Sequence, residues 1–337
     1  MKTYNDILVS VVMPVYNGAL YLREAIDSIL SQTHSNLELI IINDGSTDDS
    51  EDIIRSYEDA RIRYILNEKN SGICVTLNKG LDAAQGKYIA RMDCDDISVP
   101  ERLQKQIEYM EQNPSIGISG SDIIVFGEGI EELIFTFEHD KNCCKAGLLF
   151  ATCFAHPTVM IRRSIMDDYN LRYDEEYKGL EDFELWYRIS KHADLINLPY
   201  PLLRYRKHKS QETQNVPLRV VKKLKEFLSD RVSEFVSLRE EDMSLVDAYS
   251  RCDWAAFDDE NIYMLLSIFS RIMHSQSIIR DNGFKRGMQI TLSKAIAFAM
   301  NNSDRVTTSK RKVYTKALVE GVMPFDWYVK FVYHTFI

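Results

Sequence analysis

Long apolar runs are missing from this sequence of 337 residues. None approaches the roughly 20 residues that a membrane-spanning helix needs. The first six residues are mixed in charge, and the apolar stretch 7–12 runs into Pro14 without a small-residue cleavage site, so no secretory signal is expected. The six cysteines include no CxxC pair and no Cys/His spacing of a metal site. These absences predict a cytoplasmic protein with reduced thiols.

Basic residues are also in short supply. The chain has 41 Lys/Arg against 50 Asp/Glu, a net charge of −9, which argues against a nucleic-acid partner. A composition of 45% hydrophobic and 27% charged residues excludes disorder and fibrous repeats. The charge is uneven, because residues 1–215 hold 23 basic and 35 acidic side chains (net −12) and residues 216–337 hold 18 and 15 (net +3). Length and charge together predict two domains, 1–215 and 216–337.

The first 120 residues alternate between strand and helix patterns. Apolar runs predict buried strands at 9–15, 37–42, 62–66 and 87–92, with amphipathic helices between them. Ser46 with Asp49, and Ser98 with Glu101, have the form of capping boxes that begin helices. This alternation predicts an α/β fold with a doubly wound, mostly parallel sheet flanked by helices. Ligands bind beyond the carboxyl ends of the strands in such sheets.

The pattern changes twice after this region. Short strands are expected at 122–126, 158–161, 194–198 and 202–205, and a helix at 182–192. From Val216 onward the pattern is helical. The sequence therefore predicts an α/β domain followed by a C-terminal helical region.

Three carboxylates, Asp93, Asp95 and Asp96, follow directly on the predicted strand 87–92. Carboxylates placed this close repel one another unless a cation lies between them. Oxygen ligands suit Mg²⁺ or Mn²⁺, which bind substrate phosphates. From the residues alone, a solvated acidic turn that caps the helix beginning at Ser98 is an equal alternative.

Several segments together identify a family. They are residues 11–17 (VVMPVYN), 43–48 (NDGSTD), 70–72 (NSG) and 86–96 (GKYIARMDCDD). In order and spacing they resemble the family 2 glycosyltransferases, as do residues 179–186, similar to the family's Glu-Asp motif, and 203–208, similar to the segment that closes its catalytic domain. The resemblance covers residues 8–208. It implies the A-type glycosyltransferase fold, a nucleotide-diphospho-sugar donor, a divalent metal and inversion at the anomeric carbon.

The resemblance also assigns roles on the donor side. Asp44 would accept a hydrogen bond from the uracil N3–H, which favours a UDP-sugar donor, although alone it reads as a turn residue before Gly45. Asp93 would lie near the ribose or the metal, and Asp95 would hold the Mn²⁺ or Mg²⁺ that bridges the diphosphate. Pro14 and Tyr16, expected just past the first strand, would line the base pocket or only shape the turn.

Four further residues stand around this donor site. Arg91 would pair with the carboxylates or the diphosphate, or would form a structural salt bridge. His208 would approach the diphosphate or lie on the surface, and His156 would shape the acceptor side or be a buried structural residue. The family pattern makes Asp182 the general base, whereas a plain reading makes it one of several acids at a helix N-terminus.

The implied reaction moves a single hexose or N-acetylhexosamine from a UDP-sugar to a hydroxyl of a saccharide or lipid-linked acceptor, by analogy in bacterial surface polysaccharide synthesis. Three departures from the family pattern are visible. Cys94 occupies a position often filled by a small apolar residue, Leu77 stands where many members have arginine, and the Gln-x-x-Arg-Trp motif of processive synthases is missing. One competing function is a nucleotidyltransferase that makes nucleotide sugars, but residues 15–19 lack the basic residue its loop would need. The other is a non-catalytic nucleotide-sugar-binding protein, which would have no use for an acid at Asp182.

The end of the sequence is basic and aromatic. From Arg280 onward it has 10 basic and 4 acidic residues, a net charge of +6, with a cluster at Lys310-Arg311-Lys312. These features predict either contact with the inner face of a membrane or packing against the catalytic domain or a second subunit, as in a homodimer. The aromatic residues concerned are Phe325, Trp327, Tyr328, Phe331, Tyr333 and Phe336.

Overall fold

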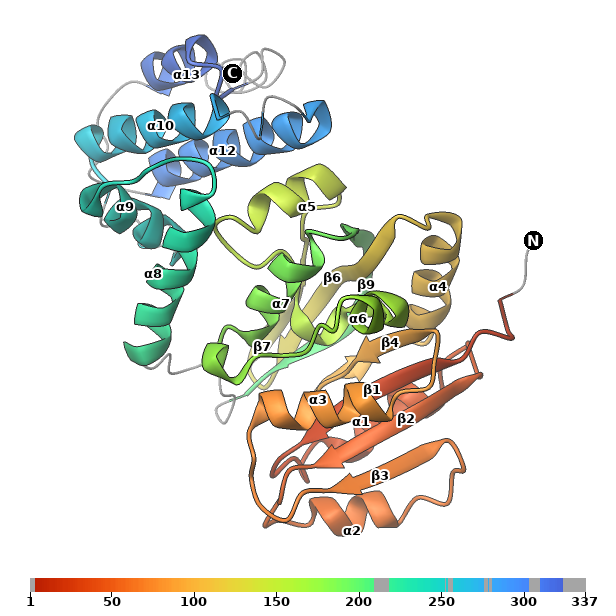
Figure 1. Cartoon of the computed structure of the whole chain (residues 1–337). Coiled ribbons are helices and arrows are strands. Elements are labelled where there is room, and N and C mark those ends of the chain that lie inside the picture. The colour runs from red at the N-terminus through yellow and green to blue at the C-terminus, as the bar shows by residue number, and fades with distance from the viewer. Residues whose placement is uncertain are drawn as a thin grey trace. The chain divides into compact units, whose positions relative to one another are not determined.

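The computed structural model divides the chain into two compact units (Figure 1). The first comprises Met1–His139 and Thr152–Val216, and the second comprises Asp140–Ala151 and Pro217–Ile337. The structure describes residues 4–208, 218–251, 253, 257–275, 278, 281–302 and 310–323. The six C-terminal aromatic residues named above lie outside the described residues.

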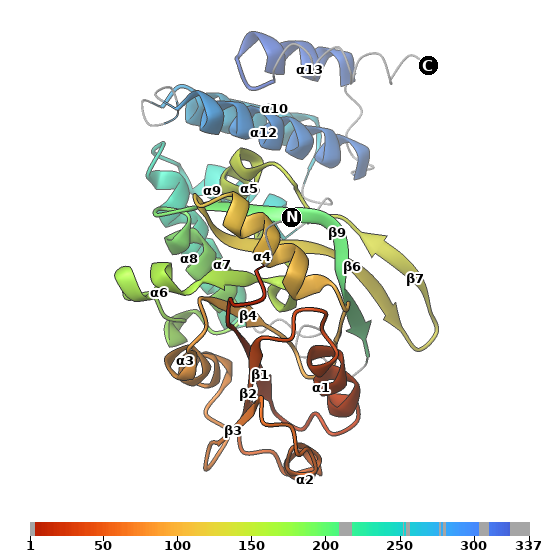
Figure 2. The ribbon, with the colours of Figure 1, turned by 90° about the vertical axis from the view of Figure 1, so that its right-hand side faces the viewer.

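A parallel four-stranded layer forms the N-terminal part of the first unit. β1 (Val9–Val15) is buried at every position and lies between β2 (Leu37–Asn43) and β4 (Tyr88–Arg91), while β3 (Ile62–Leu66) pairs with β2. The helices that connect these strands are α1 (Leu22–Leu30), α2 (Ser50–Arg55) and α3 (Ile73–Ala83). Figure 2 shows α1 and α3 on opposite sides of β1. The predicted strands and amphipathic helices are therefore confirmed in this region.

The remainder of the sheet is mixed rather than mostly parallel. The strand order is β3-β2-β1-β4-β8-β6-β9-β5, and β7 pairs with β6. β8 runs antiparallel to both β4 and β6, whereas β6 and β9 are parallel to each other. The new strands are β5 (Ile97–Ser98), β6 (Ile116–Gly127), β7 (Ile130–Phe135), β8 (Met160–Arg162) and β9 (Asp194–Lys207).

β9 replaces the two short strands predicted at 194–198 and 202–205. The register against β6 passes from Ser121 opposite Leu198 to Asp122 opposite Pro201. Pro199 and Tyr200 are thereby accommodated in an irregularity of the ladder. Proline is tolerated in a strand at such a bulge, so the strand continues where the sequence pattern predicted an interruption.

Both predicted capping boxes are wrong. α2 begins at Ser50, and the Ser46 hydroxyl instead accepts a hydrogen bond from the Asn17 N–H at 3.0 Å. Ser98 lies in β5, where its hydroxyl accepts from Gln32 Nε2 at 3.1 Å, and α4 (Arg102–Gln112) begins four residues later. Partners distant in the sequence occupy both hydroxyls, and a local pattern cannot reveal them.

Two 3₁₀ turns and two helices complete the described elements of the first unit. They are the 3₁₀ turns η1 (His156–Thr158) and η2 (Glu175–Tyr177) and the helices α6 (Arg163–Asp168) and α7 (Glu181–Ile189). α7 corresponds to the helix predicted at 182–192. Its first turn holds three acidic residues, which is favourable at a helix N-terminus.

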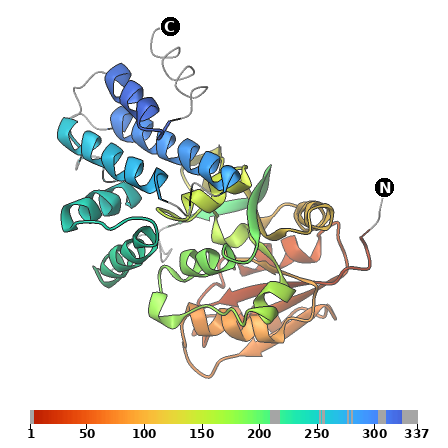
Figure 3. The ribbon, with the colours of Figure 1, turned by 45° about the horizontal axis from the view of Figure 1, so that its top comes forward.

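The second unit is helical in its described part, and Figure 3 shows α10 and α12 running side by side in it. α5 and α12 approach so closely that a Cβ on Gly287 would lie 2.4 Å from the Asn142 backbone. Among the described residues, no helix is long and apolar enough to cross a membrane. The helices are α5 (Lys141–Gly147), α8 (Leu218–Ser233), α9 (Glu240–Ser250), α10 (Asp259–Met273), α12 (Asn282–Asn302) and α13 (Lys310–Val319).

Candidate active site

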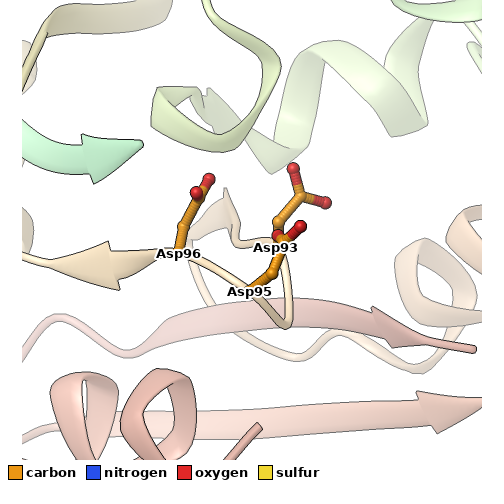
Figure 4. A group of neighbouring side chains, drawn as sticks. All are labelled: Asp93, Asp95 and Asp96. Atoms are coloured by element: carbon orange, nitrogen blue, oxygen red, sulfur yellow. The ribbon is translucent and has the colours of Figure 1, made fainter. Parts of the chain in front are cut away.

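The turn between β4 and β5 gathers three carboxylates at the carboxyl end of the parallel strands. Figure 4 shows the Asp93 and Asp95 side chains close together on this turn, with Asp96 to one side. One carboxylate oxygen from each residue lies within 4.8 Å of the other two. Asp93 and Asp95 are partly exposed, whereas Asp96 is buried. The structure therefore brings together the acidic cluster that the sequence singled out.

The carboxylate oxygens of this cluster are suitable ligands for a divalent cation. Asp96 Oδ1 accepts a hydrogen bond from the Arg206 N–H at 2.8 Å, but the buried Asp96 Oδ2 has no hydrogen-bond partner within the described part of the chain. Burial, with Asp93 and Asp95 beside it, raises the pKa of Asp96 well above its usual range. Three oxygen donors that repel one another, one of them unsatisfied, fit Mg²⁺ or Mn²⁺.

Arg91 and His208 both contact this cluster. The buried Arg91 guanidinium forms an ion pair with Asp93, as one of the sequence interpretations expected. His208 Nε2 lies 2.8 Å from Asp95 Oδ2, so the end of β9 brings this histidine to the aspartate turn. His208 is therefore a part of the cluster rather than an isolated surface residue.

Arg102 donates a hydrogen bond to the end of β4, just before the aspartate turn, and this role was not predicted from the sequence. It is fully buried on α4, and its Nη2 donates to the Arg91 carbonyl at 2.7 Å. Burial, together with the nearby Arg91 charge, lowers the pKa of Arg102 to about 9. Its position on one helical stripe with Gln106 and Met110, both buried, is the signal that could have marked it as an inward-facing residue.

Asp44 directly follows β2 and is a buried carboxylate that accepts three hydrogen bonds. Its Oδ1 accepts from Asn67 Nδ2 at 2.7 Å and from the Ser71 N–H at 2.9 Å. Its Oδ2 accepts from the Gly72 N–H at 2.9 Å. The conformation of Gly45 (φ 69°) and the backbone of Lys69, which a Gly45 Cβ would meet at 2.7 Å, explain why glycine follows Asp44.

Pro14 and Tyr16 do not both lie past the first strand. Pro14 is a buried residue within β1, which corrects the prediction, and Tyr16 follows the strand with half of its surface exposed. Proline is tolerated here because the pairing of β1 with β4 ends at Val12 opposite Arg91. Of the two, only Tyr16 offers an exposed side chain beyond the strand.

The β1–α1 loop links the Asp44 side of the site to the aspartate turn. Asn17 (φ 50°) accepts from the Thr47 N–H at 2.8 Å through its Oδ1, which ties this loop to the segment after Asp44. A Cβ on Gly18 would lie 2.8 Å from Cys94 Sγ, so the loop also packs on the turn. The loop thus contacts both the segment after Asp44 and the aspartate turn.

Asp182 occupies the first turn of α7. Its Oδ1 accepts from the Phe183 N–H at 2.7 Å. Burial, reinforced by the neighbouring Glu181 carboxylate, raises the pKa of Asp182 to about 7, while this hydrogen bond and the Arg91 charge oppose the rise. A carboxyl group that titrates near neutral pH can accept a proton from a hydroxyl substrate.

Aromatic groups lie beside these charges. His156 Nε2 lies 2.9 Å from the Tyr173 hydroxyl, and the His156 ring is 5.6 Å from that of Trp186. Burial lowers the pKa of His156 and raises that of Tyr173, and the Arg91 charge lowers the pKa of both groups. Arg91 is thus the cation that the aspartate turn, Asp182 and this aromatic group share. Tyr173 was not expected from the sequence, because no local pattern marks it.

Comparisons with known proteins place the chain in a family. The model of glycosyl transferase family 2 matches residues 10–168. The chain is 38% identical over 216 residues to an uncharacterized glycosyltransferase of Haemophilus influenzae, which covers 60% of this chain and 67% of that protein. It is 31% identical over 288 residues to an uncharacterized glycosyltransferase of Rickettsia prowazekii, which covers 81% of this chain and 86% of that protein. The protein is a glycosyltransferase, and it belongs to family 2.

Solved structures confirm the fold class. S. aureus TarS 1-349 in complex with UDP-GlcNAc matches with a TM-score of 0.58 and 16% identity, over 95% of this chain and 93% of that one. The same protein in complex with UDP matches with a TM-score of 0.57 and 16% identity, over 88% and 89%. The chain has the A-type glycosyltransferase fold with a C-terminal helical region, as the resemblance implied.

Proposed function

We propose that this glycosyltransferase moves a single hexose or N-acetylhexosamine from a UDP-sugar to a hydroxyl of a saccharide or lipid-linked acceptor, with inversion. The observation that carries the proposal is the shared cation: Arg91 pairs with Asp93 and acts electrostatically on Asp182. The guanidinium that pairs with the carboxylate cluster thus also acts electrostatically on the carboxyl group whose pKa is near neutrality. This arrangement suits a donor diphosphate on one side and an acceptor hydroxyl on the other.

The reaction would be a single displacement. Asp182 takes the proton of the acceptor hydroxyl while that oxygen bonds to the anomeric carbon and the bond from this carbon to the diphosphate oxygen breaks. The departing electron pair stays on the nucleoside diphosphate. Arg91 and His208 would face the charge that grows on this leaving group. No covalent sugar intermediate is needed, so inversion follows.

A divalent cation would be held by Asp93 and Asp95, with Asp96 as a third candidate ligand. When bound, Mn²⁺ or Mg²⁺ would supply the charge that stabilises the leaving diphosphate. The role of Asp95 is tested by thermal shift with UDP. Stabilisation by UDP should require Mn²⁺ and should be lost in Asp95→Ala, whereas equal UDP affinity with and without chelator would contradict the proposal.

The UDP preference rests on Asp44, and the exposed Tyr16 is a further candidate for lining the base pocket. The matched TarS structures contain UDP and UDP-GlcNAc, which supports the same donor class here by analogy of fold. A thermal-shift screen of UDP-, GDP- and dTDP-sugars with Mn²⁺, followed by hydrolysis assays, would identify the donor. A bacterial surface polysaccharide or glycolipid is proposed as the acceptor by analogy alone. We further propose that the site works on the cytoplasmic side and that the basic C-terminal residues would contact either a membrane or a protein surface.

A further inference from the structure

Asn67 is a buried amide that the proposed mechanism does not use. It follows β3 and is 2% exposed. Its Nδ2 donates to Asp44 Oδ1 at 2.7 Å, and its Oδ1 accepts from Lys79 Nζ on α3 at 2.6 Å. Three side chains from different parts of the fold therefore form one chain of hydrogen bonds that ends at Asp44.

The donors and acceptors in this chain of hydrogen bonds can be assigned in only one way. An ammonium group can only donate and a carboxylate can only accept, so the amide between them must direct its oxygen to Lys79 and its nitrogen to Asp44. The second Asn67 Nδ2 hydrogen is directed to Thr76 Oγ1 at 3.3 Å. Lys79 thereby fixes the rotamer and the direction of Asn67, and Asn67 fixes one oxygen of Asp44.

Asp44 retains one acceptor position. A carboxylate has about four lone-pair sites, and the bonds from Asn67, Ser71 and Gly72 occupy three of them. The remaining site is on Oδ2. A ligand that meets it must present a single N–H or O–H donor.

We propose that Lys79 and Asn67 are positioning residues that make Asp44 selective for a base with a ring N–H, so that uracil is preferred to cytosine. The proposal rests on the UDP donor proposed above. Uracil donates its N3–H to the remaining Oδ2 site, whereas the unprotonated N3 of cytosine would face a second acceptor. Leaving buried acceptors face to face is the type of mismatch that gives strong discrimination.

The test compares UDP and CDP, which are nearly equal in size, by isothermal titration of the full chain in the presence of Mn²⁺. In Lys79→Met, Asn67 loses its fixed direction, so UDP loses its aligned hydrogen bond while CDP has none to lose. We expect the ratio of the two dissociation constants to fall about tenfold through weaker UDP binding. Lys79→Arg restores a donor to Asn67 and should recover the ratio.

Lys87→Met is the matched control. Lys87 also has its ammonium on a polar partner, Glu111 at 2.5 Å, but it precedes β4, at the opposite end from the site. It should leave the ratio unchanged. A general loss of structure would weaken UDP and CDP alike, so the ratio separates positioning from folding.

The outcomes distinguish the two proposals. If the parent protein prefers UDP and Lys79→Met retains the full ratio, the positioning role is wrong while the UDP donor stands. If the parent binds UDP and CDP equally, base reading by Asp44 is wrong and the positioning role fails with it. If the parent instead prefers GDP, the UDP donor is wrong, and the ratio of GDP to ADP affinity decides the positioning role, because guanine has a ring N–H where adenine has an acceptor.

Discussion

The ionisation of the Asp182 carboxyl group should affect both the transfer rate and the stability of the protein. Its pKa of about 7 arises because burial and Glu181 disfavour the charged form. A general base must be deprotonated, so the transfer rate should rise with pH through about 7 and then level off. The pH profile of kcat/KM, which reports ionisations of the free enzyme, measures this midpoint. A profile that is flat from pH 5 to pH 8 would remove Asp182 from the role of base.

The same ionisation should affect stability. A carboxyl group whose pKa is raised in the folded state, against about 4 when unfolded, costs stability as pH rises between these values. Asn cannot ionise, so Asp182→Asn should raise the Tm relative to the parent protein more at pH 8 than at pH 5. Differential scanning calorimetry at the two pH values checks this sign. A larger gain at pH 5 would mean that Asp182 is not a carboxyl group of raised pKa.

Replacing Asp182 should separate turnover from donor binding. General-base contributions are typically about 10²–10⁴-fold, so Asp182→Asn should lower transfer by that factor. UDP affinity and its dependence on Mn²⁺ should persist, because the carboxylates of the β4–β5 turn are unchanged. Loss of UDP binding, as expected for Asp95→Ala, would instead place Asp182 in the donor site. Near-normal transfer would direct attention to Glu181.

Site residues differed in how far the sequence could reveal them. Asp93 and Asp95 are close in sequence after a strand, so a local motif found them. Asn67, Arg102 and Tyr173 contact Asp44, Arg91 and His156, each 11 or more residues away. Their residue types are ordinary for their elements. Long-range hydrogen bonds of this kind leave no local pattern, so only the structure reveals them.

At the scale of elements, the β2–α2 turn holds Asp44 in place through Gly45. Gly45→Ala would add a Cβ 2.7 Å from the Lys69 backbone at a positive φ, whereas Gly129 has a similar φ of 72° with nothing within 4 Å of its Cβ position. We expect Gly129→Ala to cost about 1 kcal/mol for the conformation alone and Gly45→Ala about 2–5 kcal/mol, because backbone must also move. Urea unfolding of the two variants measures the difference. Equal losses would show that the close approach is relieved without cost.

The strand and helix predictions succeeded where periodicity decides the structure and failed where tertiary contacts do. The parallel layer β1–β4 follows from continuous apolar runs that both faces of the sheet bury. The continuation of β9 past Pro199 depends on its register with β6, and the true starts of α2 and α4 depend on hydroxyl partners in other elements. These features require knowledge of which segments become neighbours.

At the scale of the whole molecule, the uneven distribution of charge predicts that the C-terminal region binds an anionic membrane. Residues from Arg280 onward have a net charge of +6, and basic residues near anionic lipid contribute about 1 kcal/mol each. The full chain should therefore float with anionic vesicles in a salt-sensitive manner, and a variant that ends at Asn302 should not. Absence of flotation at low salt would leave packing against protein as the explanation of this segment.

The two structural units predict how a truncated chain should behave. The boundary proposed from the sequence leaves residues 140–151 with the catalytic domain, but the structure groups this segment with the C-terminal helices. Its apolar residues Leu148, Leu149 and Phe150 are buried there, and α5 packs on α12 against Gly287. A variant that ends at Asn215 would expose this apolar surface to water, which favours aggregation.

Replacing residues 141–150 by a linker tests this explanation. We expect the variant that ends at Asn215 to be largely insoluble, and the same variant with residues 141–150 replaced by a Gly/Ser linker of about ten residues to be more soluble. Sedimentation of lysates followed by size-exclusion chromatography measures both. A matched linker in place of residues 128–135, which form the exposed β7 hairpin of the first unit, controls for the replacement itself and should not restore solubility. If the simple variant that ends at Asn215 is soluble and monomeric, the segment belongs to the catalytic domain, and the boundary read from the sequence is the correct one.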